Sequence, residues 1–230
     1  MLPNDSAWAV QKPFKDKKKE LVTYTNCTAL ENGWVWNVPL WSRIGTGYVY
    51  SSKFVSDEEA LKQFQKHLGT KELEFRNIKS RVGIHKRLWV KNVVAIGLSA
   101  GFIEPLEGNG LFSVHEFLRV LIRNLKRDEF SQWDRDNFTY ECRSIFENFA
   151  EFVALHYALS HRNDTPYWKA NFNKSWEEKL INLKPSNLQG LLWSVNNRLN
   201  WSYPDNGGLH CIAAGMNWAP TDMDEMAYRN

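Results

Sequence analysis

The apolar residues of this 230-residue chain change their spacing near residue 110. Before that point they alternate in short runs, as in Trp34, Trp36 and Val38, which is typical of strands with one buried face. Beyond it they recur every three or four residues, first over 111–125 and again from 134 to about 161, which is typical of amphipathic helices. The sequence therefore predicts an α+β fold, with an antiparallel β-meander followed by a mainly helical C-terminal region.

Turn and cap signals predict the boundaries of individual elements. Glu31-Asn-Gly33 predicts a hairpin, because Asn and Gly tolerate positive φ. Ser56-Asp-Glu-Glu59 predicts the start of a helix that ends at Gly69, and Ser175-Trp-Glu-Glu178 predicts another to about residue 183. The apolar run 93–97 predicts a strand buried on both faces. We expect one continuous domain, with a β-rich part over 1–110 and a helical part over 111–230.

Composition excludes several classes of protein. With 43% hydrophobic and 24% charged residues, the chain has the profile of a globular protein. A net charge of +3 from dispersed basic residues does not favour nucleic-acid binding, and no apolar run is long enough to span a membrane. Three widely spaced cysteines predict neither a metal site nor a disulfide framework, so we expect a cytoplasmic protein. Eleven tryptophans fit either core packing or an aromatic-lined pocket, and composition does not separate the two.

The stretch from Gly97 to Gly110 combines glycines with two carboxylates, Glu104 and Glu107, just before the first long helical pattern. A loop of this kind can offer free backbone N–H groups to an anion at a helix N-terminus. The two carboxylates suit proton transfer if burial raises the pKa of one of them. Alternatively, one carboxylate braces the helix, the other is solvated, and the loop is only a connection. Spacing alone leaves both interpretations open.

The run Trp34-Val-Trp-Asn-Val-Pro39 resembles the W-x-W-x-I-P signature of flavin-dependent tryptophan halogenases, with Val38 in place of Ile. Residues Trp34, Trp36 and Pro39 carry that signature. Further runs resemble the same family in the same order along the chain, at 43–51, 56–59, 93–107, 152–157, 164–168 and 213–218. The resemblance therefore covers essentially the whole sequence.

The resemblance implies an enzyme that uses reduced FAD, delivered by a flavin reductase, and oxygen to oxidise chloride or bromide. The oxidised halogen then reaches a lysine, beside which an electron-rich aromatic such as an indole is halogenated. Glu107, the second Glu of the E-P-L-E run, is implied as the catalytic residue, and the backbone amides of Asn109 and Gly110 as the halide site. The resemblance also implies a cofactor-binding role for Gly97, Gly101 and Gly108, and a substrate-binding role for Trp201, Tyr203 and Trp218.

Two departures from the family pattern affect the expected function. Gly108 and Asn109 stand where the family usually has Ser-Thr, so two hydroxyls are missing. The dinucleotide-binding GxGxxG motif and the catalytic-lysine motif are also absent, so the resemblance is to the C-terminal half of a halogenase. We therefore expect the chain to need an N-terminal FAD-binding half, to be inactive alone and to expose apolar surface. The alternative is a non-catalytic aromatic-binding or interaction module derived from a halogenase.

Overall fold

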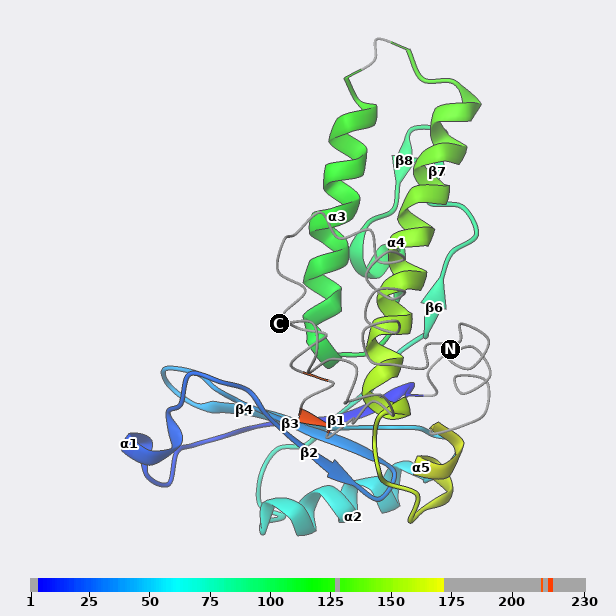
Figure 1. Cartoon of the computed structure of the whole chain (residues 1–230). Coiled ribbons are helices and arrows are strands. Elements are labelled where there is room, and N and C mark those ends of the chain that lie inside the picture. Colours follow the sequence, from blue (N-terminus) through cyan, green and yellow to red (C-terminus); the bar gives the residue numbers. More distant parts are fainter. Residues whose placement is uncertain (1–3, 127–128, 172–211, 213–214, 217–230) are drawn as a thin grey trace, which may run out of the picture.

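The computed structural model describes residues 4–126, 129–171, 212 and 215–216. A twisted sheet forms the base of the molecule, one helix lies beneath it, and two long helices stand above it (Figure 1). The predicted helix at 175–183 and the three predicted substrate-binding residues Trp201, Tyr203 and Trp218 lie outside the described residues. The α+β class predicted from the spacing of apolar residues is confirmed.

The main sheet has five antiparallel strands in the order β2-β3-β4-β1-β5. Its strands are β1 (Ser6–Lys12), β2 (Asn26–Leu30), β3 (Gly33–Pro39), β4 (Ile44–Tyr50) and β5 (Arg76–Lys79). A single helical turn, α1 (Lys17–Glu20), lies in the connection from β1 to β2 and is capped by Asp16. Strands β2, β3 and β4 form the predicted meander, and β3 ends at Pro39 as expected.

The predicted hairpin between β2 and β3 is present, but its physical reason is different from the one expected. Glu31 and Asn32 form a two-residue turn, and neither Asn32 nor Gly33 has a positive φ. Gly33 is required for another reason: a Cβ at this position would lie 1.8 Å from the carbonyl oxygen of Val49 on β4. Because Gly33 has no side chain, β3 can approach β4 closely at this point, and no left-handed turn is involved.

The lower face of the sheet is covered by α2 (Asp57–Leu68). As predicted, the Ser56 side chain caps this helix by accepting the Glu59 N–H at 3.3 Å, and Gly69 ends it in the left-handed region with a φ of 70°. Its buried face, formed by Ala60 and Phe64, packs against apolar side chains of β1, β3 and β4. One amphipathic helix thus closes a hydrophobic cluster on the lower face of the sheet.

The segment from 83 to 108 folds into short hairpins and turns that lead to the upper helices. These are β6 (Gly83–Ile84), β7 (Trp89–Val90), β8 (Val93–Val94), η1 (Gly97–Ser99), β9 (Gly101–Phe102) and η2 (Leu106–Gly108), where η marks a 3-10 turn. β6 pairs with β9, and β7 pairs with β8.

The predicted buried strand over 93–97 is wrong. β8 has only two residues, pairs with β7 alone, and leaves 66% of Val93 exposed. The backbone takes a positive φ at Lys91, before β8, and again at Gly97, after it. The chain therefore turns on both sides of β8, and its pairing with β7 stays short. An apolar run has the same appearance in the sequence whether strands flank it on both sides or on one.

Two long helices form the upper part of the molecule, as the helical spacing predicted. They are α3 (Asn109–Asn124) and α4 (Gln132–Ala158), followed by the short α5 (Pro166–Asn171). Aromatic side chains fill the space between these helices and the upper face of the sheet, including a stacked pair, Phe112 and Phe149, with ring centroids 4.8 Å apart. Trp34 and Trp36 extend from β3 into this cluster and contact each other edge to face at 6.2 Å.

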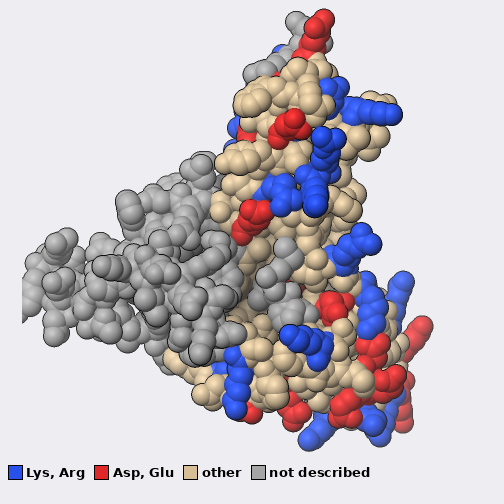
Figure 2. Space-filling model, turned by 90° about the vertical axis from the view of Figure 1, so that its right-hand side faces the viewer, with Lys and Arg blue, Asp and Glu red and all other residues tan. Residues whose placement is uncertain are grey.

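One side of α3 presents large apolar side chains to solvent. Leu111 is 83% exposed, and Leu118, Ile122 and Leu125 follow at helical spacing, with Leu98 of η1 also exposed. An exposed apolar row of this size is typical of a surface that contacts another protein part. On the face drawn in Figure 2, acidic and basic side chains are interspersed around the base. No helix within the described ranges is long and apolar enough to cross a membrane.

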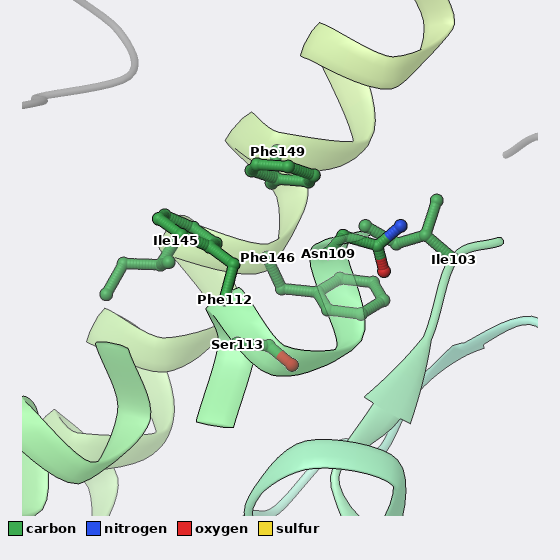
Figure 3. Close-up of a pocket in the computed structure, with 7 residues that line it drawn as sticks. All are labelled: Ile103, Asn109, Phe112, Ser113, Ile145, Phe146 and Phe149. Carbon is green, nitrogen blue, oxygen red and sulfur yellow. The ribbon is translucent and has the colours of Figure 1, made fainter. Parts of the chain in front are cut away.

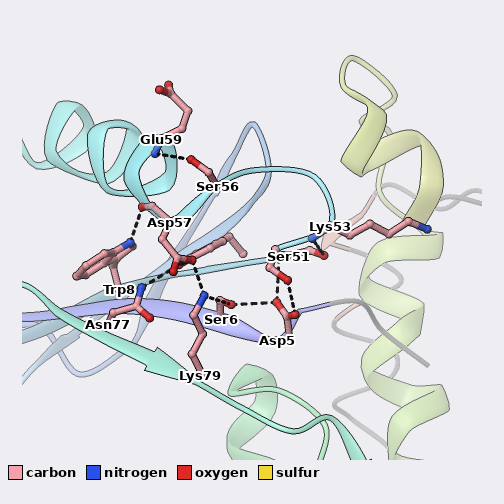
Figure 4. A network of polar contacts seen from close by, with 12 residues as sticks. Asp5, Ser6, Trp8, Ser51, Lys53, Ser56, Asp57, Glu59, Asn77 and Lys79 are labelled. Atoms are coloured by element: carbon pink, nitrogen blue, oxygen red, sulfur yellow. Dashed lines mark hydrogen bonds and ion pairs between the residues drawn. The ribbon is translucent and has the colours of Figure 1, made fainter.

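A polar network ties the N-terminal residues to the sheet and α2 (Figure 4). The Asp57 carboxylate pairs with Lys79 and accepts the Tyr50 hydroxyl at 2.6 Å, while the Trp8 indole donates to the Asp57 carbonyl oxygen at 2.8 Å. Asp5 accepts the Ser52 N–H at 2.9 Å and the Ser52 hydroxyl at 2.5 Å. These bonds fix the residues just after Asn4, and so place Asn4 inside the molecule.

The contact between Gly47 and Trp36 gives a test of the fold. A Cβ at Gly47 would lie 2.2 Å from the Trp36 ring and 2.7 Å from the Trp8 carbonyl oxygen, whereas a Cβ at Gly45 on the same strand meets only one atom, at 3.9 Å. Gly47→Ala should therefore lower the free energy of unfolding by about 1–3 kcal/mol and shift Trp fluorescence. Gly45→Ala should stay within about 0.5 kcal/mol of wild type in urea denaturation. Equal effects of the two substitutions would contradict the packing described.

Candidate active site

The loop between β9 and α3 makes a sharp turn that is braced by a side chain. Glu107 and Gly108 both have a φ of 63°, which is uncommon for a residue with a side chain such as Glu107. Asn109, the first residue of α3, is buried, and its side-chain amide donates to the carbonyl oxygens of Glu104 and Leu106, the latter at 2.9 Å. The brace holds the left-handed turn at Glu107 immediately before the N-terminus of α3.

Glu104 is completely buried and hydrogen-bonded on both carboxyl oxygens. The Tyr157 hydroxyl lies 2.9 and 3.0 Å from the two oxygens, and the Asn4 side-chain N–H donates to Oε2 at 2.7 Å. The Tyr167 hydroxyl donates in turn to the side-chain oxygen of Asn4 at 3.0 Å. The buried indole N–H of Trp34 also lies near this carboxyl and favours its ionised form. The cluster joins residues from the N-terminus, β3, the loop, α4 and α5.

Burial sets the protonation of Glu104. Loss of hydration raises the pKa of this carboxyl to about 7, although hydrogen bonds from Tyr157 and Asn4 favour the ionised form and oppose the rise. The same burial raises the pKa of Tyr157 well above its usual range, with the nearby Glu104 adding to the effect. Glu104 therefore changes charge close to neutral pH.

Glu107 is in a different environment. Its side chain is 40% exposed, and its Oε1 lies 3.0 Å from Nε2 of His156 on α4. The hydrogen bond from His156 lowers the pKa of Glu107, against a smaller opposing effect of burial. Successive residues of α4 thus bind the two carboxylates, with His156 on Glu107 and Tyr157 on Glu104. The two pKa values move in opposite directions, a pattern typical of sites that need both an acid and a base.

The glycines predicted to bind the cofactor fall into two groups. A Cβ at Gly97 would lie 2.6 Å from Val114, and one at Gly101 would lie 2.5 Å from the Gly83 carbonyl oxygen, so protein atoms already occupy both positions. A Cβ at Gly108 or Gly110 would meet no atom within 4 Å. Of the three cofactor glycines, only Gly108 thus leaves open space for a ligand, while packing explains Gly97 and Gly101. Their cofactor role stays a prediction.

A small cavity lies behind the start of α3 (Figure 3). Its volume of about 10 Å³ is enough for about one water molecule. Its lining residues are mostly apolar and come from the loop, α3 and α4: Ile103, Asn109, Phe112, Ser113, Ile145, Phe146 and Phe149. This cavity is too small for an aromatic substrate. Among the described residues, no group of three His, Cys, Asp or Glu is placed to hold a metal ion.

Four residues of the site were not predicted as site residues from the sequence. Asn4, Tyr157 and Tyr167 bind or support Glu104, and His156 binds Glu107. A signal was present in the run 152–157, which resembles the halogenase family and contains both His156 and Tyr157. No pattern in the sequence points to Asn4.

Comparisons with known proteins identify relatives of this chain. The sequence profile of the family described as tryptophan halogenase matches residues 1–229. The chain is 39% identical to tryptophan 6-halogenase SttH of Streptomyces toxytricini, over 73% of this chain and 32% of that protein. It is 32% identical to tryptophan 7-halogenase RebH of Lentzea aerocolonigenes, over 95% of this chain and 44% of that protein.

Solved structures of similar fold also include halogenases. The apo structure of VirX1 superposes with a TM-score of 0.81 at 39% identity, covering 98% of this chain and 45% of that one. Other solved neighbours are described as flavin-dependent halogenases. The sequence matches and the shared fold thus place the chain in the flavin-dependent halogenase class. The chain belongs to the tryptophan halogenase family, and it spans 32% of the length of SttH and 44% of the length of RebH.

The raised pKa of Glu104 predicts a pH-dependent stability. A carboxyl whose folded pKa is raised stabilises the fold below its ordinary pKa, and this contribution is lost as the pH rises through about 7. The unfolding free energy of Glu104→Gln, relative to wild type, should therefore rise between about pH 5 and pH 8, by at most about 3 kcal/mol.

Urea denaturation across this range measures the difference, and Glu107→Gln is the matched control. Since the pKa of Glu107 is lowered, its stabilising contribution is present at neutral pH and lost as the pH falls through the folded pKa. The titration of Glu107 itself should therefore add no rise between pH 5 and pH 8. A flat difference for Glu104→Gln would contradict the account of the buried carboxyl.

Proposed function

We propose that this chain supplies the carboxylate side of the active site of a flavin-dependent halogenase that acts on an electron-rich aromatic such as an indole. The observation that carries the proposal is the position of Glu107. It is a half-exposed carboxylate, held at a left-handed turn by His156 and placed directly before the N-terminus of a 16-residue helix. Family membership supports the reaction class, and this turn provides a base and an anion site side by side.

The halide is proposed to lie against the first backbone N–H groups of α3, at Asn109 and Gly110. The first-turn amides of a helix have no partner within the helix, and the helix dipole favours an anion there. The amide group of Asn109 is turned inward to two carbonyl oxygens, so the backbone is left for the halide. Open space around Gly110 allows close approach. The hydroxyls that Gly108 and Asn109 lack are not needed for this mode of binding.

Glu107 is proposed as the base that completes the substitution on the aromatic ring. When a ring carbon bonds to the oxidised halogen, it must lose its proton to restore aromaticity. Oε1 of Glu107 is bound to His156, which leaves Oε2 to accept this proton. Because the pKa of Glu107 is lowered, the carboxylate is ionised at neutral pH and can act as a general base.

The flavin is proposed to be held only in part by this chain. Gly108 offers open space beside the halide site, whereas Gly97 and Gly101 are filled by protein atoms. Reduced FAD, delivered by a flavin reductase, would supply the electrons that activate oxygen for oxidation of the halide. We propose that an FAD-binding part with the catalytic lysine packs against the exposed apolar side of α3, next to the Glu107 loop. Trp201, Tyr203 and Trp218 remain the proposed substrate-binding residues.

This proposal predicts the activity of the chain with and without the rest of the enzyme. The purified 230-residue chain, given reduced FAD supplied by a flavin reductase and its reductant, with oxygen, bromide and tryptophan, should form little or no halogenated product by mass spectrometry. The same chain joined to the FAD-binding part of a tryptophan halogenase should form product. Within that assembly, Glu107→Gln should reduce turnover by about 100-fold or more, because a general base is lost.

Gln65→Glu on the far side of the sheet is a control that should retain the assembled activity, because α2 lies away from the loop. Turnover by the isolated chain would contradict the proposed division of the site. Full activity of the Glu107→Gln assembly would contradict the role of Glu107. Tight binding of an indole without turnover in any assembly would favour the non-catalytic binding module.

A further inference from the structure

We propose that His156 is the positioning residue of this site: its imidazole fixes the orientation of Glu107 and keeps that side chain ready to accept a proton. The inference rests on the proposed function of Glu107 and adds a residue to it. It starts from two contacts of one ring. His156 Nε2 lies 3.0 Å from Glu107 Oε1, and Nδ1 lies 3.2 Å from the carbonyl oxygen of Val153 one helical turn earlier.

The contact with Glu107 determines the role of Nε2. An ionised carboxylate only accepts hydrogen bonds, so Nε2 must carry a hydrogen to bond with Glu107. The other ring nitrogen, Nδ1, contacts the Val153 carbonyl oxygen within the same helix. A hydrogen bond to a charged carboxylate is stronger than a neutral one and stabilises the ionised state of Glu107.

The ring is held from its own helix and from a neighbouring aromatic side chain. Phe152, one turn before His156, contacts the imidazole edge to face with ring centroids 5.6 Å apart and an interplanar angle of 85°. Only 18% of the His156 side chain is exposed, against 40% for Glu107. His156, the less exposed residue, thus has a fixed position on a 27-residue helix, whereas Glu107, the more exposed one, lies on a turn. His156 therefore anchors Glu107, and not the reverse.

Other titratable groups near the pair are few in the described part of the chain. Cys27 on β2 is close enough for Glu107 to raise the pKa of its thiol, although burial is the larger cause. Glu104, on the same loop, feels the positive charge of His156, which lowers its pKa against the dominant effect of burial. Two neighbouring residues of α4 contact different carboxylates: Tyr157 binds Glu104, and His156 binds Glu107. Among these groups, His156 is the one that donates a hydrogen bond to Glu107.

The consequence for the reaction is geometric. With Oε1 bound to His156, only Oε2 is left to take the proton from the ring carbon, so the accepting atom has a defined direction. The proton leaves the carbon, its bonding electrons return to the ring, and a neutral carboxylic acid results at Glu107. Without His156, the carboxylate on a turn would lose its fixed orientation toward the ring proton.

The test is a carboxyl titration of the 230-residue chain, which does not require catalytic activity. Carbon-13 labelled glutamate would be followed by NMR, with Glu107→Gln used to assign the resonance. His156→Gln keeps a neutral donor and should raise the pKa of Glu107. His156→Ala removes both donor and charge and should raise it further. His67→Gln, on the exposed face of α2, should leave it unchanged.

In an active assembly, the pH at which turnover falls on the acid side of the profile should rise from wild type to His156→Gln, and again to His156→Ala. Thermal unfolding of each variant shows whether the fold persists. An unchanged Glu107 titration in folded His156→Gln and His156→Ala would overturn the inference. If the titration shifts but Glu107→Gln retains full turnover, the positioning contact stands and the proposed catalytic role of Glu107 fails.

Discussion

The structure depends on one carboxyl group, that of Glu104, which is completely buried. An isolated carboxyl group in an apolar interior is strongly unfavourable unless it is hydrogen-bonded or protonated. Asn4 and Tyr157 supply the hydrogen bonds, and Tyr167 supports Asn4. The N-terminal residues, the loop, α4 and α5 must therefore meet at one point. A contact between residues 4 and 167 joins parts of the chain that local spacing alone could not bring together.

Once Glu104 is anchored, the rest of the loop follows. Asn109 closes the turn onto the carbonyl oxygens of Glu104 and Leu106, and the left-handed backbone at Glu107 directs the second carboxylate outward to His156. One carboxylate is buried, with its pKa raised towards neutral, and the other is half-exposed, with its pKa lowered. Of the two interpretations drawn from spacing, the structure shows one carboxylate buried in the loop before the helix and the other half-exposed beside His156, and the proton-transfer role of Glu107 stays a prediction.

The sequence predicted those parts of the molecule that depend on local periodicity. The meander, the capped helix α2 and the two long helices all appear at or near their expected positions, because amphipathic patterns and caps act over a few residues. The run 93–97 was misinterpreted, because burial of a strand depends on neighbours that are distant in sequence. Asn4 and the pairing of His156 with Glu107 were missed for the same reason. The family was recognised from collinear motifs, and the roles of individual residues remain predictions.

The central claim is that the two carboxyls of one loop are held in different protonation states at mildly acidic pH. Infrared spectroscopy of the chain with isotope-labelled glutamate, compared with Glu104→Gln, measures this directly. At about pH 6, the account predicts a protonated carboxyl band from Glu104 that disappears as the pH rises through about 7, while Glu107 gives a carboxylate band throughout. Two carboxylate bands at pH 6, with no protonated band lost in Glu104→Gln, would contradict the account.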